Sequence, residues 1–144
     1  MEIVELNRLT KEHGKEVLTL MEELDAEINV TEDMINETVE SPLTHFFAMM
    51  NETGSIIGCA SLCVYYSPTG KKASVEDVVI SSAHRGQHLG RKLMEHLIDY
   101  ARKDLKNVEL HLTSRPHRIA ANELYKSLGF RQKETNVYIM KIKE

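Results

Sequence analysis

The stretch from Val75 to Arg102 constrains the fold of this chain more than any other part of its sequence. It begins with β-branched residues typical of a strand and passes through a short turn with two glycines. It then continues into a run whose apolar residues recur every three or four positions. This order predicts a strand, a loop and an amphipathic helix. Because the first turn of a helix carries unpaired N–H groups and a partial positive charge, the loop is suited to a pyrophosphate.

The loop itself reads Arg85-Gly86-Gln87-His88-Leu89-Gly90 and is followed by Arg91. Glycine can adopt positive φ and lets a ligand approach the main chain closely. A P-loop is excluded because no Lys-Ser/Thr pair follows Gly90, and a dinucleotide fingerprint is excluded because its third glycine is missing. A βα turn without a ligand is the alternative that this segment alone leaves open.

The size and composition of the chain predict one globular domain covering residues 1–144. Hydrophobic residues make up 42% and charged residues 28% of the sequence. The chain has no apolar run of about 18 residues and no charged-then-apolar leader, so we expect a cytoplasmic protein without a membrane partner. The net charge is −4 with scattered Lys and Arg, which argues against nucleic-acid binding.

Acidic residues are concentrated in the first 40 positions, where they would either attract a cationic substrate or form a solvated helical face. Cys59 and Cys63 lie four residues apart in a predicted strand, too far apart for a disulfide, which favours reduced core residues. His84 and His88 share a turn, but no cysteine or carboxylate joins them at ligand spacing. We therefore expect no metal site.

Hydrophobic periodicity and capping residues predict a mixed α/β domain with the order β-α-α-β-β-β-α-β-α-β. Thr10 and Thr31 are predicted N-caps of the first two helices, and Ser114 of the last. Pro116 is expected in the first turn of that last helix, and Gly129 in a left-handed cap at its end. The predicted strands are Met1–Leu9, Leu43–Met50, Ser55–Tyr66, Val75–Ile80, Asn107–Leu112 and Thr135–Ile142; the predicted helices outside the central one run from Lys11 to Ile28, from Thr31 to Glu40 and up to Leu128.

Two segments resemble the GNAT superfamily of N-acetyltransferases. The loop from Arg85 to Gly90 is similar to the Gln/Arg-x-x-Gly-x-Gly/Ala loop of that family, and the strand Glu76–Ile80 precedes it. The second segment, Ala121–Phe130, is similar to the family's Ala-x-x-Leu-Tyr-x-x-x-Gly-Phe helix ending. The resemblance implies the GNAT acyl-CoA N-acyltransferase fold, with acetyl-CoA as the acyl donor and an amine as the acceptor.

The resemblance also implies a set of cofactor-binding residues. It assigns the thioester oxygen to the main chain of Val78 and the pantetheine arm to Val79 and Ile80, at a bulge where the strand is splayed from its neighbour. Two positions depart from the family pattern: His88 replaces the middle glycine, and Arg118 replaces an Asn that contacts the cofactor. The remaining residues expected to bind the cofactor are Arg85, Gly86, Gln87, Leu89, Gly90, Arg91, Asn122 and Tyr125.

Three side chains are expected to move protons. An alkylamine has a pKa of about 10.4, so a base must deprotonate the acceptor before it attacks. Glu76 or Asp77, which project to opposite faces of a regular strand, could remove that proton directly or through a water; an ordinary salt bridge or hydrogen bond is the alternative. Tyr125 resembles the family's general acid, which protonates the departing thiolate, and a core tyrosine is its alternative.

The overall prediction is an acetyl-CoA-dependent N-acetyltransferase that acts on a primary amine of a small molecule or peptide by direct attack. Direct attack is favoured over a cysteine acyl-enzyme because neither cysteine has an adjacent base in the sequence. The alternatives are a non-catalytic acyl-CoA-binding sensor or docking module, and a transferase of longer acyl groups. The predicted last strand, Thr135–Ile142, could lie at a sheet edge and pair with a second copy, giving a homodimer.

Overall fold

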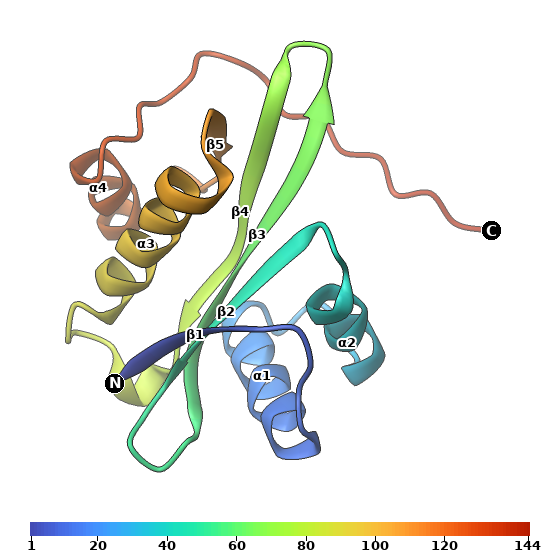
Figure 1. Cartoon of the computed structure of the whole chain (residues 1–144), viewed down its shortest axis with the longest axis vertical. Helices are drawn as coiled ribbons and strands as arrows, with labels where there is room; N and C mark the ends of the chain where they lie inside the picture. The colour runs from blue at the N-terminus through green and yellow to red at the C-terminus, as the bar shows by residue number, and fades with distance from the viewer. The chain divides into compact units, whose positions relative to one another are not determined.

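The computed structural model describes residues 1–144 (Figure 1). The chain divides into two compact units, Met1–Thr113 and Ser114–Glu144, which are described in turn. The first unit contains β1 (Glu2–Leu6), α1 (Lys11–Leu24), α2 (Glu32–Glu40), β2 (Thr44–Met50), β3 (Ile56–Ser67), β4 (Gly70–Ile80), the 3₁₀ turn η1 (Ser82–His84), α3 (Leu89–Tyr100), the π-helical turn η2 (Ala101–Leu105) and β5 (Val108–His111).

The five strands of the first unit form one sheet in the order β1-β2-β3-β4-β5. Each of the first three strands is antiparallel to the next, and β3 and β4 form a long hairpin closed by a turn at Ser67–Gly70 (Figure 1). The last strand, β5, is parallel to β4. The predicted mixed α/β class is therefore confirmed, with antiparallel pairing between consecutive strands and one parallel pair connected through α3.

Side-chain caps start the first two helices as predicted. The Thr10 Oγ1 accepts a hydrogen bond of 3.1 Å from the main-chain N–H of His13, and the Thr31 Oγ1 accepts one of 3.2 Å from Met34. The predicted end of the first helix was wrong, because α1 stops at Leu24. The carboxylate of Asp25 instead accepts the main-chain N–H of Glu27 at 2.9 Å, and this local turn replaces the next helical turn.

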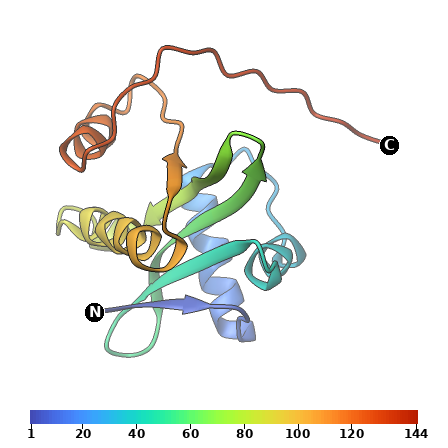
Figure 2. The ribbon, with the colours of Figure 1, turned by 45° about the horizontal axis from the view of Figure 1, so that its top comes forward.

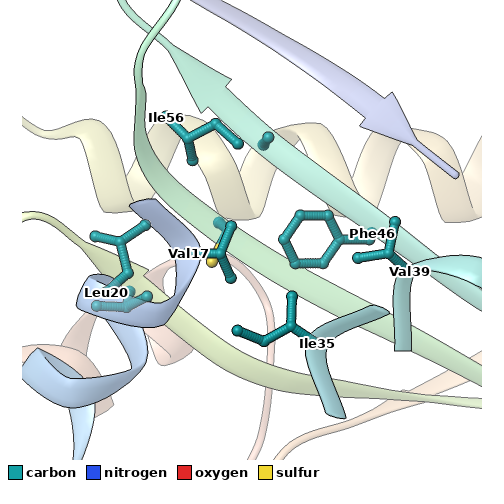
Figure 3. Packing of buried hydrophobic residues seen from close by; sticks show 9 residues of the cluster. Val17, Leu20, Ile35, Val39, Phe46 and Ile56 are labelled. Atoms are coloured by element: carbon teal, nitrogen blue, oxygen red, sulfur yellow. The ribbon is translucent and has the colours of Figure 1, made fainter. Parts of the chain in front are cut away.

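Two adjacent phenylalanines of β2 show how helices cover both faces of the sheet. Successive strand residues point to opposite faces, so Phe46 and Phe47 pack on different sides. Phe46 belongs to a buried cluster with Val17 of α1 and with Ile35 and Val39 of α2, which surround its ring in Figure 3. Phe47 instead contacts α3, whose Tyr100 ring centroid lies 5.1 Å away. Figure 2 shows α1 and α3 on opposite faces of the sheet.

The central helix has the buried stripe that the sequence predicts. Leu89, Leu93, Met94 and Leu97 of α3 are buried, and Ala101 continues the stripe into η2. Burying a leucine side chain contributes about 1.5–3 kcal/mol, so this stripe is what holds α3 on the sheet. The start of α3, and with it the glycine loop, is thereby fixed to the end of β4.

The second unit contains α4 (Ile119–Ser127), whose predicted start was wrong. Ser114 does not cap the helix. Instead, the Arg115 carbonyl accepts hydrogen bonds from the Arg118 main-chain N–H at 3.1 Å and from the Asn122 side-chain amide at 3.0 Å. Pro116 therefore lies in a turn that precedes the helix, where its fixed φ is well suited to the second position.

The end of α4 confirms the predicted left-handed cap, because Gly129 has a φ of +104°. The predicted strand Thr135–Ile142 was wrong, since residues 130–144 contain no regular secondary structure. The alternating apolar pattern is present, but a strand forms only when its main chain pairs with a neighbour, and this segment has no ladder in the structure. Its large apolar side chains remain exposed, by 73% at Val137 up to 88% at Tyr138.

Candidate active site

The centre of the candidate site is the carboxyl half of β4, which separates from β5. The two strands pair only from Lys71 to Ser74, opposite Val108–His111, whereas β4 continues to Ile80. Beyond Ser74, the edge of β4 that faces away from β3 therefore carries unpaired main-chain N–H and C=O groups. The splayed strand that the family resemblance implies is present, and it offers a free edge to an extended ligand.

A β-bulge interrupts the free half of β4. Glu76 pairs with Ser61 and Val79 pairs with Cys59, so Asp77 and Val78 together oppose the single residue Ala60 of β3. Asp77 has a φ of +52°, the left-handed conformation that Asp tolerates better than most residues. The bulge therefore redirects the side chain of Asp77 and breaks the regular alternation of the strand.

The expectation that Glu76 and Asp77 project to opposite faces was wrong, because it assumed a regular strand. Residues directly opposite each other in a ladder share a face, so Glu76 lies on the face of Ser61. Ser61 and Asp77 line the same cavity. The two carboxylates are thus on one side of the sheet, where the Ser74 hydroxyl donates a hydrogen bond of 2.6 Å to Glu76.

The environment of Asp77 makes its carboxylate more basic than an ordinary aspartate. Burial raises the pKa of Asp77, and the negative charge of Glu76 raises it further. The side chain still has accessible surface, because it opens into the cavity, while the protein packed around it reduces the solvation of the charge. No hydrogen bond or ion pair fixes its carboxylate, so Asp77 is available to a substrate.

The cavity beside Asp77 lies between α1, α2 and the sheet and has a volume of about 170 Å³. Ser61, which is 5% exposed, contributes its hydroxyl to the wall and makes no hydrogen bond. Apart from Asp25, Thr38, Ser61 and Asp77, the lining is apolar. Ser61 was not among the predicted site residues, and its only signal in the sequence was a polar side chain within an otherwise apolar stretch of predicted strand.

The loop between β4 and α3 has the conformation expected of a phosphate-binding turn. Gly86 has a φ of +82° and His88 a φ of +59°, so both adopt the left-handed region. Glycine enters this region without cost, whereas His88 occupies it despite its Cβ. The left-handed conformation explains why the family has a glycine at this position. His88 adopts the same conformation, at a conformational cost that glycine would not have.

The first turn of α3 offers main-chain donors to an anion. His88 is the N-cap residue, its side chain makes no capping hydrogen bond, and no acidic residue lies in the first turn. The N–H groups at the start of the helix thus remain available, with the helix dipole directed at them. Leu89, Gly90 and Arg91 form this turn, which suits a diphosphate.

Arg85 is turned toward the main chain. Its Nε donates a hydrogen bond of 3.2 Å to the carbonyl of Ile80. The N–H of Ser81 donates to the carbonyl of Ile57 on β3 at 2.7 Å, so by strand alternation the Ile80 amide faces the free edge. The Ile80 carbonyl is therefore occupied, and its N–H is the group left for a ligand. Arg91 forms an ion pair of 3.4 Å with Glu95, one helical turn away.

A contact between distant segments ties the loop to α1. The carboxylate of Glu23 accepts hydrogen bonds from the Ser82 hydroxyl at 2.7 Å and from the Ser82 main-chain N–H at 3.3 Å. The same helix supplies Met21 and Leu24 to the cavity wall. One helix therefore contacts both the loop and the cavity.

The other predicted site residues lie in the second unit. Tyr125 is on α4, half-buried, and its ring lies 6.3 Å from that of Phe130. Asn122 uses its side-chain nitrogen to hold the Arg115 carbonyl, which leaves its oxygen as the free group. Arg118 is the N-cap residue of α4 and makes no side-chain cap.

The cysteines of the first unit are free, as predicted. Burial, followed by the charge of Asp77, raises the pKa of the Cys59 thiol to about 12. Burial is also the main reason for the raised pKa of Cys63. Neither thiol is therefore an activated nucleophile at neutral pH.

Two further observations concern the chain as a whole. None of its helices combines the length and the apolar character needed to cross a membrane. No cluster of three or more His, Cys, Asp or Glu side chains is arranged to hold a metal ion.

Comparisons with known proteins agree with this geometry. The family model described as "Acetyltransferase (GNAT) family" matches residues 7–130. The N-alpha-acetyltransferase RimI of Mycobacterium tuberculosis is 27% identical over 115 residues, which cover 76% of this chain and 70% of that protein. A putative acetyltransferase structure from Agrobacterium tumefaciens has a TM-score of 0.81 at 21% identity, covering 98% of this chain and 100% of the other.

A third comparison concerns a structure that contains a ligand. AAC(6')-Iy in complex with the bisubstrate analogue CoA-S-monomethyl-acetylneamine has a TM-score of 0.75 at 15% identity, covering 98% of this chain and 97% of the other. The splayed strand, the uncapped helix start and the family match together identify the chain. It belongs to the acetyltransferase (GNAT) family, whose members use acetyl-CoA as donor for acetyl transfer to amines.

Proposed function

We propose that this protein transfers the acetyl group of acetyl-CoA to a primary amine of a small molecule or peptide by direct attack. The observation that carries the proposal is the bulge at Asp77. It sets a carboxylate without a partner beside the free edge of β4 and at the wall of a cavity. The start of α3, which follows the same strand, supplies the main-chain donors for the diphosphate of the donor.

The proposed base is Asp77. A protonated amine with a pKa of about 10.4 must lose a proton before its lone pair can attack. A carboxylate whose pKa is raised accepts that proton more readily than an ordinary aspartate does, directly or through a water. Glu76, whose carboxylate is already held by Ser74, contributes its charge, which raises the pKa of Asp77.

Main-chain groups of β4 are proposed to hold the donor. Bound acetyl-CoA supplies the thioester, at which a C–N bond to the amine forms and the C–S bond breaks. The Val78 N–H is proposed to donate to the carbonyl oxygen, where negative charge develops during attack. The main chain of Val79 and Ile80 is proposed to pair with the extended arm, like an added strand. The unpaired edge beyond Ser74 supports these roles.

Tyr125 is proposed to give its phenolic proton to the departing thiolate sulfur. The support for this role is the match of Ala121–Phe130 to the family's helix ending and the half-buried position of the ring on α4. Arg118 and the free oxygen of Asn122 are proposed to contact the cofactor near the same helix. The protonated amine loses two protons in this scheme. Asp77 receives the first before attack, and Tyr125 gives its phenolic proton to sulfur as the C–S bond breaks. The second proton, on the nitrogen of the tetrahedral intermediate, passes through solvent to the Tyr125 phenolate and restores the phenol.

The experiment that tests this function is an acceptor screen that detects free coenzyme A. We expect acetyl-CoA-dependent thiol release with at least one primary amine, and we expect Asp77→Asn to reduce that release by about 10²-fold or more. Calorimetry should give similar CoA affinities for the natural protein and for Asp77→Asn, because Asp77 is proposed to act on the amine and not on CoA. Tight CoA binding without thiol release for any amine would overturn catalysis and support the sensor alternative.

A further inference from the structure

The cavity beside Asp77 has properties that restrict which amine can enter it. Its volume of about 170 Å³ is close to that of engineered apolar cavities of about 150 Å³ that bind benzene. Its mouth is formed by large apolar side chains that are unusually exposed, Ile28 by 53% and Met34 by 45%. Exposed apolar residues grouped around a hollow are typical of a ligand site rather than of ordinary surface.

The polar groups of the cavity wall are few, and two of the four are already engaged. The Asp25 carboxylate accepts the N–H of Glu27, and the Thr38 hydroxyl donates to the Met34 carbonyl at 2.9 Å. Asp77 and Ser61 are left, and neither makes a hydrogen bond. Ser61 is a largely buried residue that lines the cavity, so its hydroxyl and the Asp77 carboxylate mark the polar end of the cavity.

The charge of the wall has one sign. Asp25 and Asp77 are its ionisable carboxylates, and no Lys, Arg or His belongs to the lining. A ligand ammonium group is attracted to this wall, whereas a ligand carboxylate or phosphate would meet like charges without any compensating cation. Like charges in contact oppose binding, so an anionic ligand should bind more weakly than the matching amine without the anionic group.

We infer that the acceptor is a primary amine with a single positive charge and a compact apolar body of about the size of a benzene ring, without a carboxylate or phosphate beside the amine. This inference rests on the proposed function and names the acceptor class of the same site. The ammonium group lies at Asp77 and Ser61, and the apolar body lies against Met21, Ile28 and Met34. The Ser61 hydroxyl accepts a hydrogen bond from the ammonium group and orients it.

The first test compares matched ligands by their binding, so that its result does not depend on turnover. Saturation-transfer NMR with the full chain and saturating CoA would measure the dissociation constants of phenethylamine, phenylalanine, phenylalaninamide and glucosamine. We expect phenethylamine and phenylalaninamide to bind about tenfold or more tightly than phenylalanine, which adds only a carboxylate. Glucosamine should bind weakly because it lacks an apolar body. Equal binding of phenylalanine and phenethylamine, or no binding of phenethylamine, would overturn the inference.

The second test changes the wall. Met34→Lys adds a cation at the cavity mouth, which should weaken the binding of phenethylamine and strengthen the binding of phenylalanine. The ratio of the phenethylamine affinity to the phenylalanine affinity should therefore fall by about tenfold or more. Leu43→Lys is the matched control, because Leu43 is also exposed, by 55%, but does not line the cavity. An affinity ratio that Met34→Lys leaves unchanged would show that the amine binds elsewhere.

The third test addresses Ser61. Ser61→Ala should weaken the binding of phenethylamine severalfold, because the ammonium group loses its hydrogen bond to the Ser61 hydroxyl. The CoA affinity should stay unchanged, because CoA does not contact this hydroxyl in the proposed site. Thiol release assays on the same proteins separate the two levels of the proposal. Selective binding of apolar amines without any thiol release would refute catalysis and keep the acceptor class. Thiol release with polar or anionic amines alone would keep catalysis and refute the acceptor class.

Discussion

The main-chain N–H of Phe130 donates a hydrogen bond of 3.0 Å to the carbonyl of Tyr125, and the two rings lie 6.3 Å apart in an edge arrangement. Gly129 between them donates to the Lys126 carbonyl at 3.1 Å, which completes a Schellman motif. The Tyr-x-x-x-Gly-Phe spacing is therefore a helix ending in which the last residue packs against the tyrosine. The motif orients Tyr125 as well as terminating α4.

Tyr125→Phe should keep this packing and remove only the phenolic proton. We expect kcat to fall by about tenfold or more with CoA affinity nearly unchanged, because the proton of a general acid is missing. Steady-state kinetics and calorimetry measure the two quantities. Tyr138→Phe is the matched control, since Tyr138 is 88% exposed and outside the site. An unchanged kcat for Tyr125→Phe would remove its role as proton donor.

Asp77→Asn should stabilise the protein at neutral pH. Because burial and Glu76 raise the pKa of Asp77, its contribution to stability is fully present below the ordinary carboxyl pKa and is lost as pH rises through the raised value. Asn tolerates the left-handed conformation, so the bulge is retained. We expect a higher Tm than the natural protein at pH 7.5 and a smaller difference at pH 3.5. The same Tm difference at both pH values would contradict this electrostatic account.

His88 should respond oppositely to two substitutions, because its φ of +59° penalises bulky side chains. His88→Val should lose about 1 kcal/mol of unfolding free energy, since β-branched residues are disfavoured in the left-handed region. His88→Gly should be free of that cost and should bind CoA more tightly through closer main-chain approach. Denaturant unfolding and calorimetry test the pair, and a loss of CoA affinity in His88→Gly would instead assign the imidazole to the cofactor.

Cys59 should remain unmodified during the reaction. With a pKa of about 12, only about one thiol in ten thousand is ionised at pH 8. Native protein incubated with acetyl-CoA in the absence of an amine should therefore show no added acetyl mass by mass spectrometry. Iodoacetamide should label Cys59 only after denaturation. An acetylated cysteine peptide would replace direct attack with a two-step mechanism.

The segment Thr135–Ile142 should mediate association with a second copy. Its alternating residues favour strand pairing, and its main chain and apolar side chains are exposed. We expect a dimer in analytical ultracentrifugation and a monomer after the joint changes Tyr138→Lys and Ile139→Lys. Glu134→Lys is the control, because it raises the net charge by the same two units at a neighbouring position outside the segment. It should leave the dimer intact. A monomeric natural protein at high concentration would refute this prediction.

Local chemistry was sufficient to predict much of the fold. The caps at Thr10 and Thr31, the left-handed Gly129 and the stripe of α3 depend on side chains and main chain within a few residues, and all four were confirmed. The errors at Ile28 and Ser114 arose where a second local hydrogen bond competed with the helix. Periodicity cannot rank such alternatives, because each satisfies the same main-chain groups.

The candidate site shows more clearly which features the sequence predicts and which depend on the tertiary structure. The sequence by itself determined the loop, the strand before it and the identity of Asp77 as an acidic residue at the end of that strand. Only the tertiary structure decided that Asp77 faces the cavity on the same side as Glu76, and that Ser61 lies beside it without a partner. The reason is physical: a bulge arises from the register between β3 and β4, and the alternation within one strand does not contain that register.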